Sequence, residues 1–376
     1  MPTRSPGFGW VIQPHPALHH SPTARLGLWV LNHVPRLAPL AERLREALMA
    51  SRTFGWILQP GAGGPQPAAR LLEDNRRFLT LLDGHFDTFW IEDHFQWGTA
   101  PTLEAWTSLT WQAARFPTYR CGTMVLGQSY RNPALLAKAA ATLQWLAGGR
   151  LILGIGAGWK EDEYRAYNFP FPAAATRIHE LREAATIIKT MWSTSPATYA
   201  GTHYRITAAF CEPRPTPPPP LMIGGGGEKL TLRVVAELAD WWNLGFVPFS
   251  EYERKWQRLA EHCAAVGRDP ATIKKTYFAL VSISNDPSRI LRREGLHIVG
   301  GNPAQVADEL AQFVASGVEH FQIRFLDFPD PAGAELFIQT VVPQLSGRQG
   351  PGQAHASDNP ALSYSSASNS ISETTG

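Results

Sequence analysis

The chain has 376 residues, with 34 Lys and Arg against 32 Asp and Glu, and therefore a formal net charge of +2. This balance, without a basic block, excludes an electrostatic footprint for nucleic acid, and 44% hydrophobic against 18% charged residues argues against disorder of the whole chain. Three widely spaced cysteines, no apolar run of membrane-spanning length and no signal-peptide pattern predict a soluble protein of the reducing cytoplasm, without a membrane partner or a disulfide framework.

Both ends of the chain fall outside the regular pattern of the middle. The heptad that starts at Phe8 (FGWVIQP) returns almost unchanged at Phe54 (FGWILQP), but different residues follow each copy, so the repeat is not an array of structural units. We predict that residues 1–52 are a poorly ordered N-terminal extension, with Met49 a plausible true start. Residues 346–376 are rich in Ser, Gly, Ala and Asn and predict a disordered polar tail.

Between these ends, in residues 53–345, short β-branched or aromatic runs alternate with longer amphipathic stretches. The expected strands are residues 53–59, 88–92, 120–126, 151–155, 221–224, 240–246, 275–283 and 320–325. The expected helices are residues 67–83, 104–116, 133–147, 176–192, 228–238, 251–266, 303–316 and 332–342. Since each parallel strand pair needs a crossover, this α/β alternation predicts a (β/α)8 barrel with insertions after the fourth and seventh strand units.

Barrel enzymes place their catalytic residues after the C-terminal ends of strands. The second expected strand is followed by Asp93 and His94, an acid beside a side chain that titrates near neutral pH. This pattern predicts Asp93 and His94 as catalytic candidates. The alternative is that His94 only caps the strand through hydrogen bonds.

Two groups of glycines also follow expected strands. Gly224, Gly225, Gly226 and Gly227 precede a helix expected to begin at Glu228, and their free backbone and the helix N-terminus predict a phosphate site, with a flexible loop as the alternative.

The glycines of residues 154–159 fail the dinucleotide-binding pattern because Trp159 stands where a third glycine is required, so Gly156 is expected to let a planar ligand lie close to the fourth strand. For the next loop, residues 160–163, the sequence leaves two alternatives open: a solvated charged face or a set of proton donors. We expect no metal, because His94 with Asp93 are the only His and acid clearly grouped at a strand end.

Seven blocks in order resemble the luciferase-like monooxygenase superfamily, and within it the branch of bacterial proteins assigned to coenzyme F-420. The blocks are residues 89–95, 131–138, 146–159, 169–172 with Arg177, 201–204, 221–227 and 239–243. The resemblance implies a bacterial-luciferase-like barrel that holds coenzyme F-420, or alternatively FMN, at its C-terminal mouth.

The resemblance also implies roles for individual residues. The cofactor ring would lie against Val125, Leu126, Gly127 and Gln128, where the family often carries a backbone bulge, with Gly156 nearby and the phosphate on the glycines of residues 224–227. Asp93 and His94 match a pair that contacts the cofactor and manages a proton, and Asp162 is a further cofactor-binding candidate. Trp97 and Trp159 would line the substrate pocket.

In the sugar-phosphate dehydrogenases of this branch a catalytic Glu stands where this chain has Trp159. We therefore expect an apolar, aromatic-walled substrate site and no oxidation of glucose 6-phosphate.

Three functions follow from the resemblance. The first is an oxidoreductase that passes hydride between coenzyme F-420 and a small organic substrate. The alternatives are an FMN-dependent monooxygenase that uses oxygen and reduced flavin, and a non-catalytic flavin-binding protein. A separate flavin or F-420 reductase and a homodimer are the expected partners.

Overall fold

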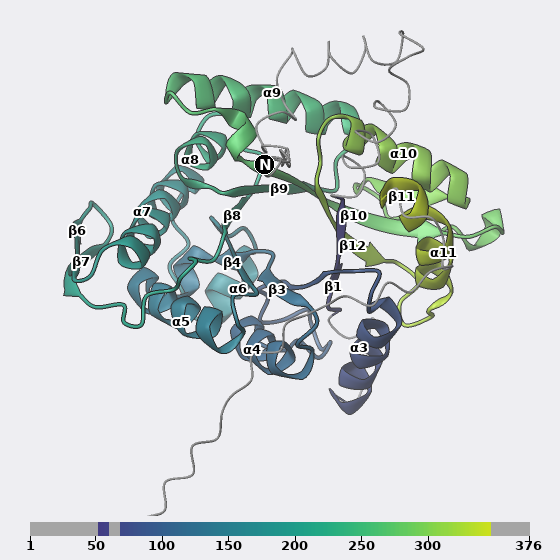
Figure 1. Cartoon of the computed structure of the whole chain (residues 1–376), viewed down its shortest axis with the longest axis horizontal. Coiled ribbons are helices and arrows are strands. Elements are labelled where there is room, and N and C mark those ends of the chain that lie inside the picture. Colours follow the sequence, from purple (N-terminus) through teal and green to yellow (C-terminus); the bar gives the residue numbers. More distant parts are fainter. Residues whose placement is uncertain (1–51, 60–67, 347–376) are drawn as a thin grey trace, which may run out of the picture.

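The computed structural model describes residues 52–59 and 68–346, so the predicted extension and polar tail lie outside the described part. Its parallel strands close into a barrel ringed by helices, which confirms the (β/α)8 fold (Figure 1). The barrel strands are β1 (Thr53–Ile57), β2 (Thr88–Ile91), β3 (Arg120–Thr123), β5 (Leu151–Gly156), β8 (Leu221–Gly224), β9 (Trp241–Gly245), β10 (Lys274–Ile283) and β12 (His320–Phe325). The barrel closes because β12 pairs with both β1 and β10, through Phe321 opposite Phe54 and Tyr277.

The surrounding helices follow the expected order. They are α3 (Ala68–Leu82), α4 (Ala105–Arg115), α5 (Pro133–Leu146), α7 (Ala174–Ser193), α8 (Thr231–Leu238), α9 (Phe249–Ala265), α10 (Pro303–Ala315) and α11 (Ala332–Ser346). Local sequence explains several of their starts. Asn132 accepts hydrogen bonds from the backbone N–H groups at the start of α5, and Asn302 forms a capping box with Gln305 at the start of α10.

One expected helix boundary is wrong. The helix α8 begins at Thr231 and not at Glu228. The carboxylate of Glu228 is bound instead by Arg254 and Lys255 of α9, and His262 of α9 contacts the Glu228 carbonyl oxygen at 2.7 Å. These tertiary contacts accompany a turn at residues 228–230 in place of a first helical turn.

The two insertions contain structure that the sequence pattern did not reveal. The first carries the antiparallel hairpin of β6 (Ala197–Ala200) and β7 (Arg205–Ala209), which lies outside α7 in Figure 1. The second carries β11 (Ile298–Gly301), which pairs with β10. The short β4 (Leu126–Gly127) and α6 (Glu161–Ala166) were also not predicted.

The barrel interior is filled by large side chains, so the open space lies at the mouth. In the barrel interior, Trp90 is fully buried, and its indole N–H donates to His320 Nε2 at 3.0 Å. A Cβ added at Gly55 or Gly122 would come within 2.2 or 2.3 Å of the Trp90 ring, so both positions require glycine for this close approach. Within the described ranges, no helix is long and apolar enough to cross a bilayer.

Candidate functional site

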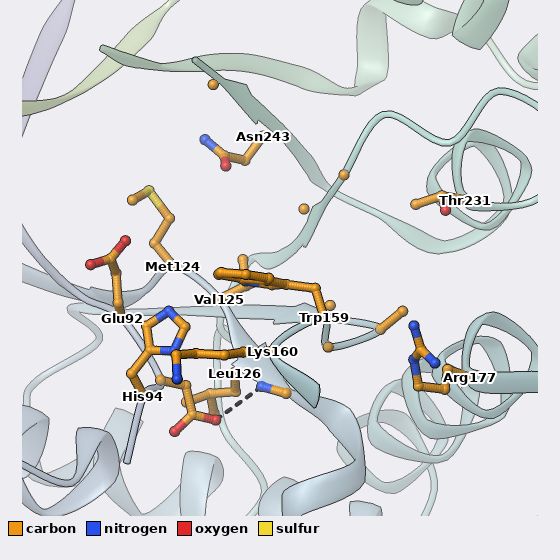
Figure 2. Close-up of a pocket in the computed structure, with 18 of the residues that line it drawn as sticks. Glu92, His94, Met124, Val125, Leu126, Trp159, Lys160, Arg177, Thr231 and Asn243 are labelled. Carbon is orange, nitrogen blue, oxygen red and sulfur yellow. Dashed lines mark hydrogen bonds between the residues drawn. The ribbon is translucent and has the colours of Figure 1, made fainter. Parts of the chain in front are cut away.

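A cavity of about 420 Å³ opens at the C-terminal ends of the strands (Figure 2). The sequence-predicted residues that line it are Asp93, His94, Val125, Leu126, Gly127, Gly156, Trp159, Gly224 and Gly225. These residues come from the ends of β2, β4, β5 and β8, which confirms that the strand ends meet in one place as a barrel requires.

Other predicted site residues lie next to the cavity and not on its wall. Gln128 is buried behind it, where its amide accepts a hydrogen bond from Tyr204 and donates one to Glu180. Asp162 is an exposed side chain paired with Lys160. Gly226 and Gly227 continue the chain beyond the two lining glycines, and Trp97 lines a smaller neighbouring cavity.

The carboxylate of Asp93 is fully engaged by protein groups. Arg131 donates to both oxygens, at 2.7 and 2.9 Å, and the backbone N–H of Gly127 donates to Oδ2 at 2.9 Å. Arg131 also contacts Glu104 at 2.6 Å. A bidentate pair of this kind fixes geometry as well as charge, so Asp93 holds the end of β2 against the end of β4.

His94 has a buried acid partner that lies 69 residues away in the chain. Its Nδ1 is 3.1 Å from Oε2 of Glu163, whose other oxygen accepts the backbone N–H groups of Phe95 and Gln96 at 2.9 and 3.1 Å. Glu163 is fully buried. Because an ionised carboxylate can only accept hydrogen bonds, a proton on Nδ1 satisfies this contact, and in the neutral ring with that tautomer Nε2 is an acceptor.

Aromatic rings surround His94 on the rim. The ring centroids of Trp97 and Trp159 lie 4.6 and 5.8 Å from that of His94, and the ammonium of Lys160 lies 4.8 Å from the Trp97 ring centroid. Figure 2 shows His94 and Lys160 on one side of the cavity, Trp159 above its centre, and Arg177 on the other side. These rings shield His94, whose side chain is 13% exposed.

The middle of the cavity wall has a flat, close-packed backbone. The Met124–Val125 peptide bond is cis, and β4 begins directly after it. A Cβ added at Gly156 or Gly224 would come within 2.7 or 3.0 Å of the Val125 side chain. The missing side chains therefore let the Val125 side chain pack closely against β5 and β8 at the cavity wall.

The far end of the cavity suits an anionic group. Gly225 has φ +125°, in the region that favours glycine. Six residues later, Thr231 begins α8. Arg177 of α7 also lines the cavity, and its Nε is buried without a hydrogen-bond partner among the described residues. The N–H of Gly225 itself donates to the Asn243 carbonyl oxygen at 3.0 Å, so the Thr231 hydroxyl and the Arg177 guanidinium are the groups here that fit a phosphate.

Tyr130 adds a neutral hydrogen-bonding group to the wall. Burial, with further contributions from Tyr164 and Glu163, raises the pKa of the Tyr130 phenol well above its ordinary value. The phenol therefore stays protonated at any physiological pH.

Sequence reasoning missed Glu163, Arg131 and Arg177 as members of the site. Arg131 and Arg177 lay inside the matching blocks but drew no attention, because a lone arginine carries no motif. Glu163 belongs to residues 160–163, for which the sequence left open a solvated charged face or a set of proton donors, and its spacing from Lys160 gave no sign of burial. In the part of the chain that the structure covers, no group of three or more His, Cys, Asp or Glu could hold a metal ion.

A sequence model of the luciferase-like monooxygenases matches residues 52–294. Two relatives named F420-dependent glucose-6-phosphate dehydrogenase are 36% identical (Kineococcus radiotolerans) and 37% identical (Intrasporangium calvum). The first alignment covers 54% of this chain and 62% of that relative, and the second covers 70% and 91%. The chain thus spans less than two thirds of the length of the first relative.

Solved structures share the fold at low identity. An F420-dependent secondary alcohol dehydrogenase in complex with an F420–acetone adduct superposes with a TM-score of 0.66 at 19% identity, covering 78% of this chain and 99% of that one. The FMN-bound oxygenating constituent of a 3,6-diketocamphane monooxygenase from Pseudomonas putida gives a TM-score of 0.62 at 16% identity, covering 78% and 98%.

Proposed function

The chain belongs to the luciferase-like monooxygenase family, and on that basis we propose that it is an oxidoreductase that uses coenzyme F-420 to transfer hydride to or from a small organic substrate. The observation that carries the proposal is His94 on the cavity wall with Nδ1 held by the buried Glu163. A histidine fixed in this way presents an acceptor nitrogen to the cavity, as a general base for a substrate O–H or N–H requires.

Different residues of the cavity would have different roles in binding and proton transfer. Arg177, Thr231 and the N–H groups of Gly226 and Gly227 would bind the cofactor phosphate, while Val125, packed against Gly156 and Gly224, would support its ring. When bound, the deazaflavin supplies a hydride-accepting or hydride-donating carbon. His94 would hold the proton that accompanies the hydride at the substrate heteroatom. Asp93 would act through Gly127 and Arg131 as a positioning residue.

FMN is the alternative cofactor, in a monooxygenase that uses oxygen. Its ring system has the same flat shape, and FMN-bound members share this fold. Anaerobic titration of the purified protein with coenzyme F-420 and with FMN, followed by fluorescence, separates the two functions. We expect binding of F-420; binding of FMN alone would favour the monooxygenase, and binding of neither would refute both.

The substrate proposed here is not glucose 6-phosphate, although relatives carry that name. Trp159 stands at the rim where the sugar-phosphate enzymes of the resemblance have an acid, and its side chain is 67% exposed beside His94. An indole offers one donor and no acceptor, so it suits an apolar substrate wall. Failure of glucose 6-phosphate to reduce F-420 in the presence of the protein tests this point.

We further propose that the protein is a homodimer in the cytoplasm and that a separate reductase supplies it with reduced cofactor. The support for the dimer is an apolar face on α4 and α5, where Trp111, Leu135, Trp145 and Leu146 are 48, 66, 57 and 82% exposed. The support for a reducing compartment is that Cys121, Cys211 and Cys263 are free. Sedimentation of the protein and of Leu146→Glu, expected to be a dimer and a monomer, tests the interface.

A further inference from the structure

A second cavity, of about 50 Å³, lies beside the main one and shares Glu92 and His94 with it. Its apolar wall comes from the residue after β1, from α3, from the end of β2 and from the loop before α4: Leu58, Leu71, Leu72, Ile91 and Leu103. We call this space the side cavity. At roughly 10–15 Å³ for each water-sized position, it has room for about four non-hydrogen atoms.

The side cavity contains a buried acceptor with no partner. Gln112 of α4 lines it, is 4% exposed, and has an Oε1 atom without a hydrogen-bond partner in the described ranges. The neighbouring Asn75 cannot supply a donor, because its amide N–H groups already donate to the carbonyl oxygens of Gln59 and Leu71. Leaving a buried carbonyl unpaired is unfavourable, so the site favours a ligand that brings a donor.

The wall between the two cavities carries one acidic side chain, Glu92, and its charge is compensated by an arginine. Glu92 lines both spaces and is paired with Arg324 of β12, whose guanidinium also lies 5.4 Å from the Phe278 ring centroid. Figure 2 shows Glu92 and Met124 on the same side of the main cavity. A substrate can therefore extend from His94 past Glu92 without meeting an unpaired charge.

We propose that the side cavity is a specificity subsite that receives the distal end of the substrate: a short apolar chain ending in a neutral hydrogen-bond donor, a hydroxyl or primary amide, bound by Gln112. This inference rests on the proposed function, because the reacting carbon stays in the main cavity beside His94. An anionic end would be repelled by the unpaired Oε1 of Gln112 and by the carboxylate of Glu92. An ammonium end would lose its hydration among leucines while the Glu92 charge is held by Arg324.

The test uses the cofactor-loaded protein and three probes that share a secondary alcohol: 2-pentanol, 1,4-pentanediol and 4-hydroxypentanoate. They differ only in a methyl, hydroxymethyl or carboxylate end, and their binding is measured by ligand-observed NMR, which needs no turnover. We expect the diol to bind about 3- to 10-fold more tightly than 2-pentanol, as one hydrogen bond in a shielded site allows, and the carboxylate to bind most weakly.

Two variants and a control locate the effect. Gln112→Leu should remove the preference for the diol, and Leu71→Phe should weaken 2-pentanol and the diol together by filling the side cavity. Leu291→Phe, at an exposed position that lines neither cavity, should change nothing. Cofactor binding by every variant reports that it is folded.

The proposal is overturned if the diol preference survives in Gln112→Leu, which would mean that a group other than Gln112 binds the end of the diol. It is equally overturned if the cofactor-loaded protein binds no probe. A protein that binds neither F-420 nor FMN instead refutes the proposed function, so the two failures are distinguishable.

Discussion

The contact between His94 and Glu163 predicts a defined imidazole tautomer, and Glu163→Gln is the change that tests it. In the native contact Oε2 can only accept, so Nδ1 carries the proton. A glutamine in the same place can still accept the N–H groups of Phe95 and Gln96 through its oxygen, but its amide N–H group then faces Nδ1. Two donors cannot share one contact, so the ring must move its proton to Nε2.

The size of the effect follows from the bonds exchanged. A hydrogen bond to a charged group contributes about 1.5–3 kcal/mol and a neutral one about 0.5–1.5 kcal/mol, so the exchange should destabilise the folded state by about 1–2 kcal/mol. The effect on reactivity should be larger. With Nε2 protonated, His94 loses its role as a base, which typically slows proton transfer about 100-fold or more.

Nitrogen-15 NMR of histidine-labelled protein at pH 8 measures the tautomer directly, with His94→Gln used to assign the signal. We expect a protonated Nδ1 in the native protein and a protonated Nε2 in Glu163→Gln. Glu161→Gln is the matched control, because Glu161 lies two residues earlier and is an exposed partner of Arg165. An unchanged His94 spectrum in folded Glu163→Gln would refute the positioning role.

Three more predictions concern other residues. Arg177→Met should weaken F-420 binding about 10- to 150-fold through loss of a charge-assisted contact, whereas Arg182→Met, on the same helix and exposed, should not; equal affinities in the titration would move the phosphate elsewhere. Burial holds the pKa of His320 well below its usual value, so this ring stays neutral in the folded state while the unfolded state takes up a proton near pH 6.5. The free energy of unfolding should therefore fall below pH 6.5 by up to about 1.4 kcal/mol per pH unit. In urea unfolding, the slope of this free energy against pH should be smaller in His320→Gln by the equivalent of one proton. An identical slope in the two proteins would count against the prediction. Burial also raises the pKa of Cys121 to about 11, so iodoacetamide at pH 8 should label it only in denaturant, and labelling of the native protein would contradict its packing.

The sequence predicted the barrel and its strand ends because these depend on local patterns. Short β-branched or aromatic runs located every barrel strand and helical spacing located the surrounding helices, and Asp93, His94 and Gly225 were found because they closely follow strands. The hairpin of β6 and β7 escaped this reasoning. Most of its residues are half-buried or exposed, so no apolar alternation marks it.

What only the tertiary structure decided is which side chains meet across elements. Glu163 looked like one acid in a solvated run, yet the fold buries it under His94, and Asp93 pairs with Arg131 from a loop 38 residues on. The unpaired Gln112 oxygen in the side cavity depends on the packing of β1, α3 and α4. Such contacts leave no period in the sequence, because they are set by how rigid elements pack and not by the spacing of residues within any one of them.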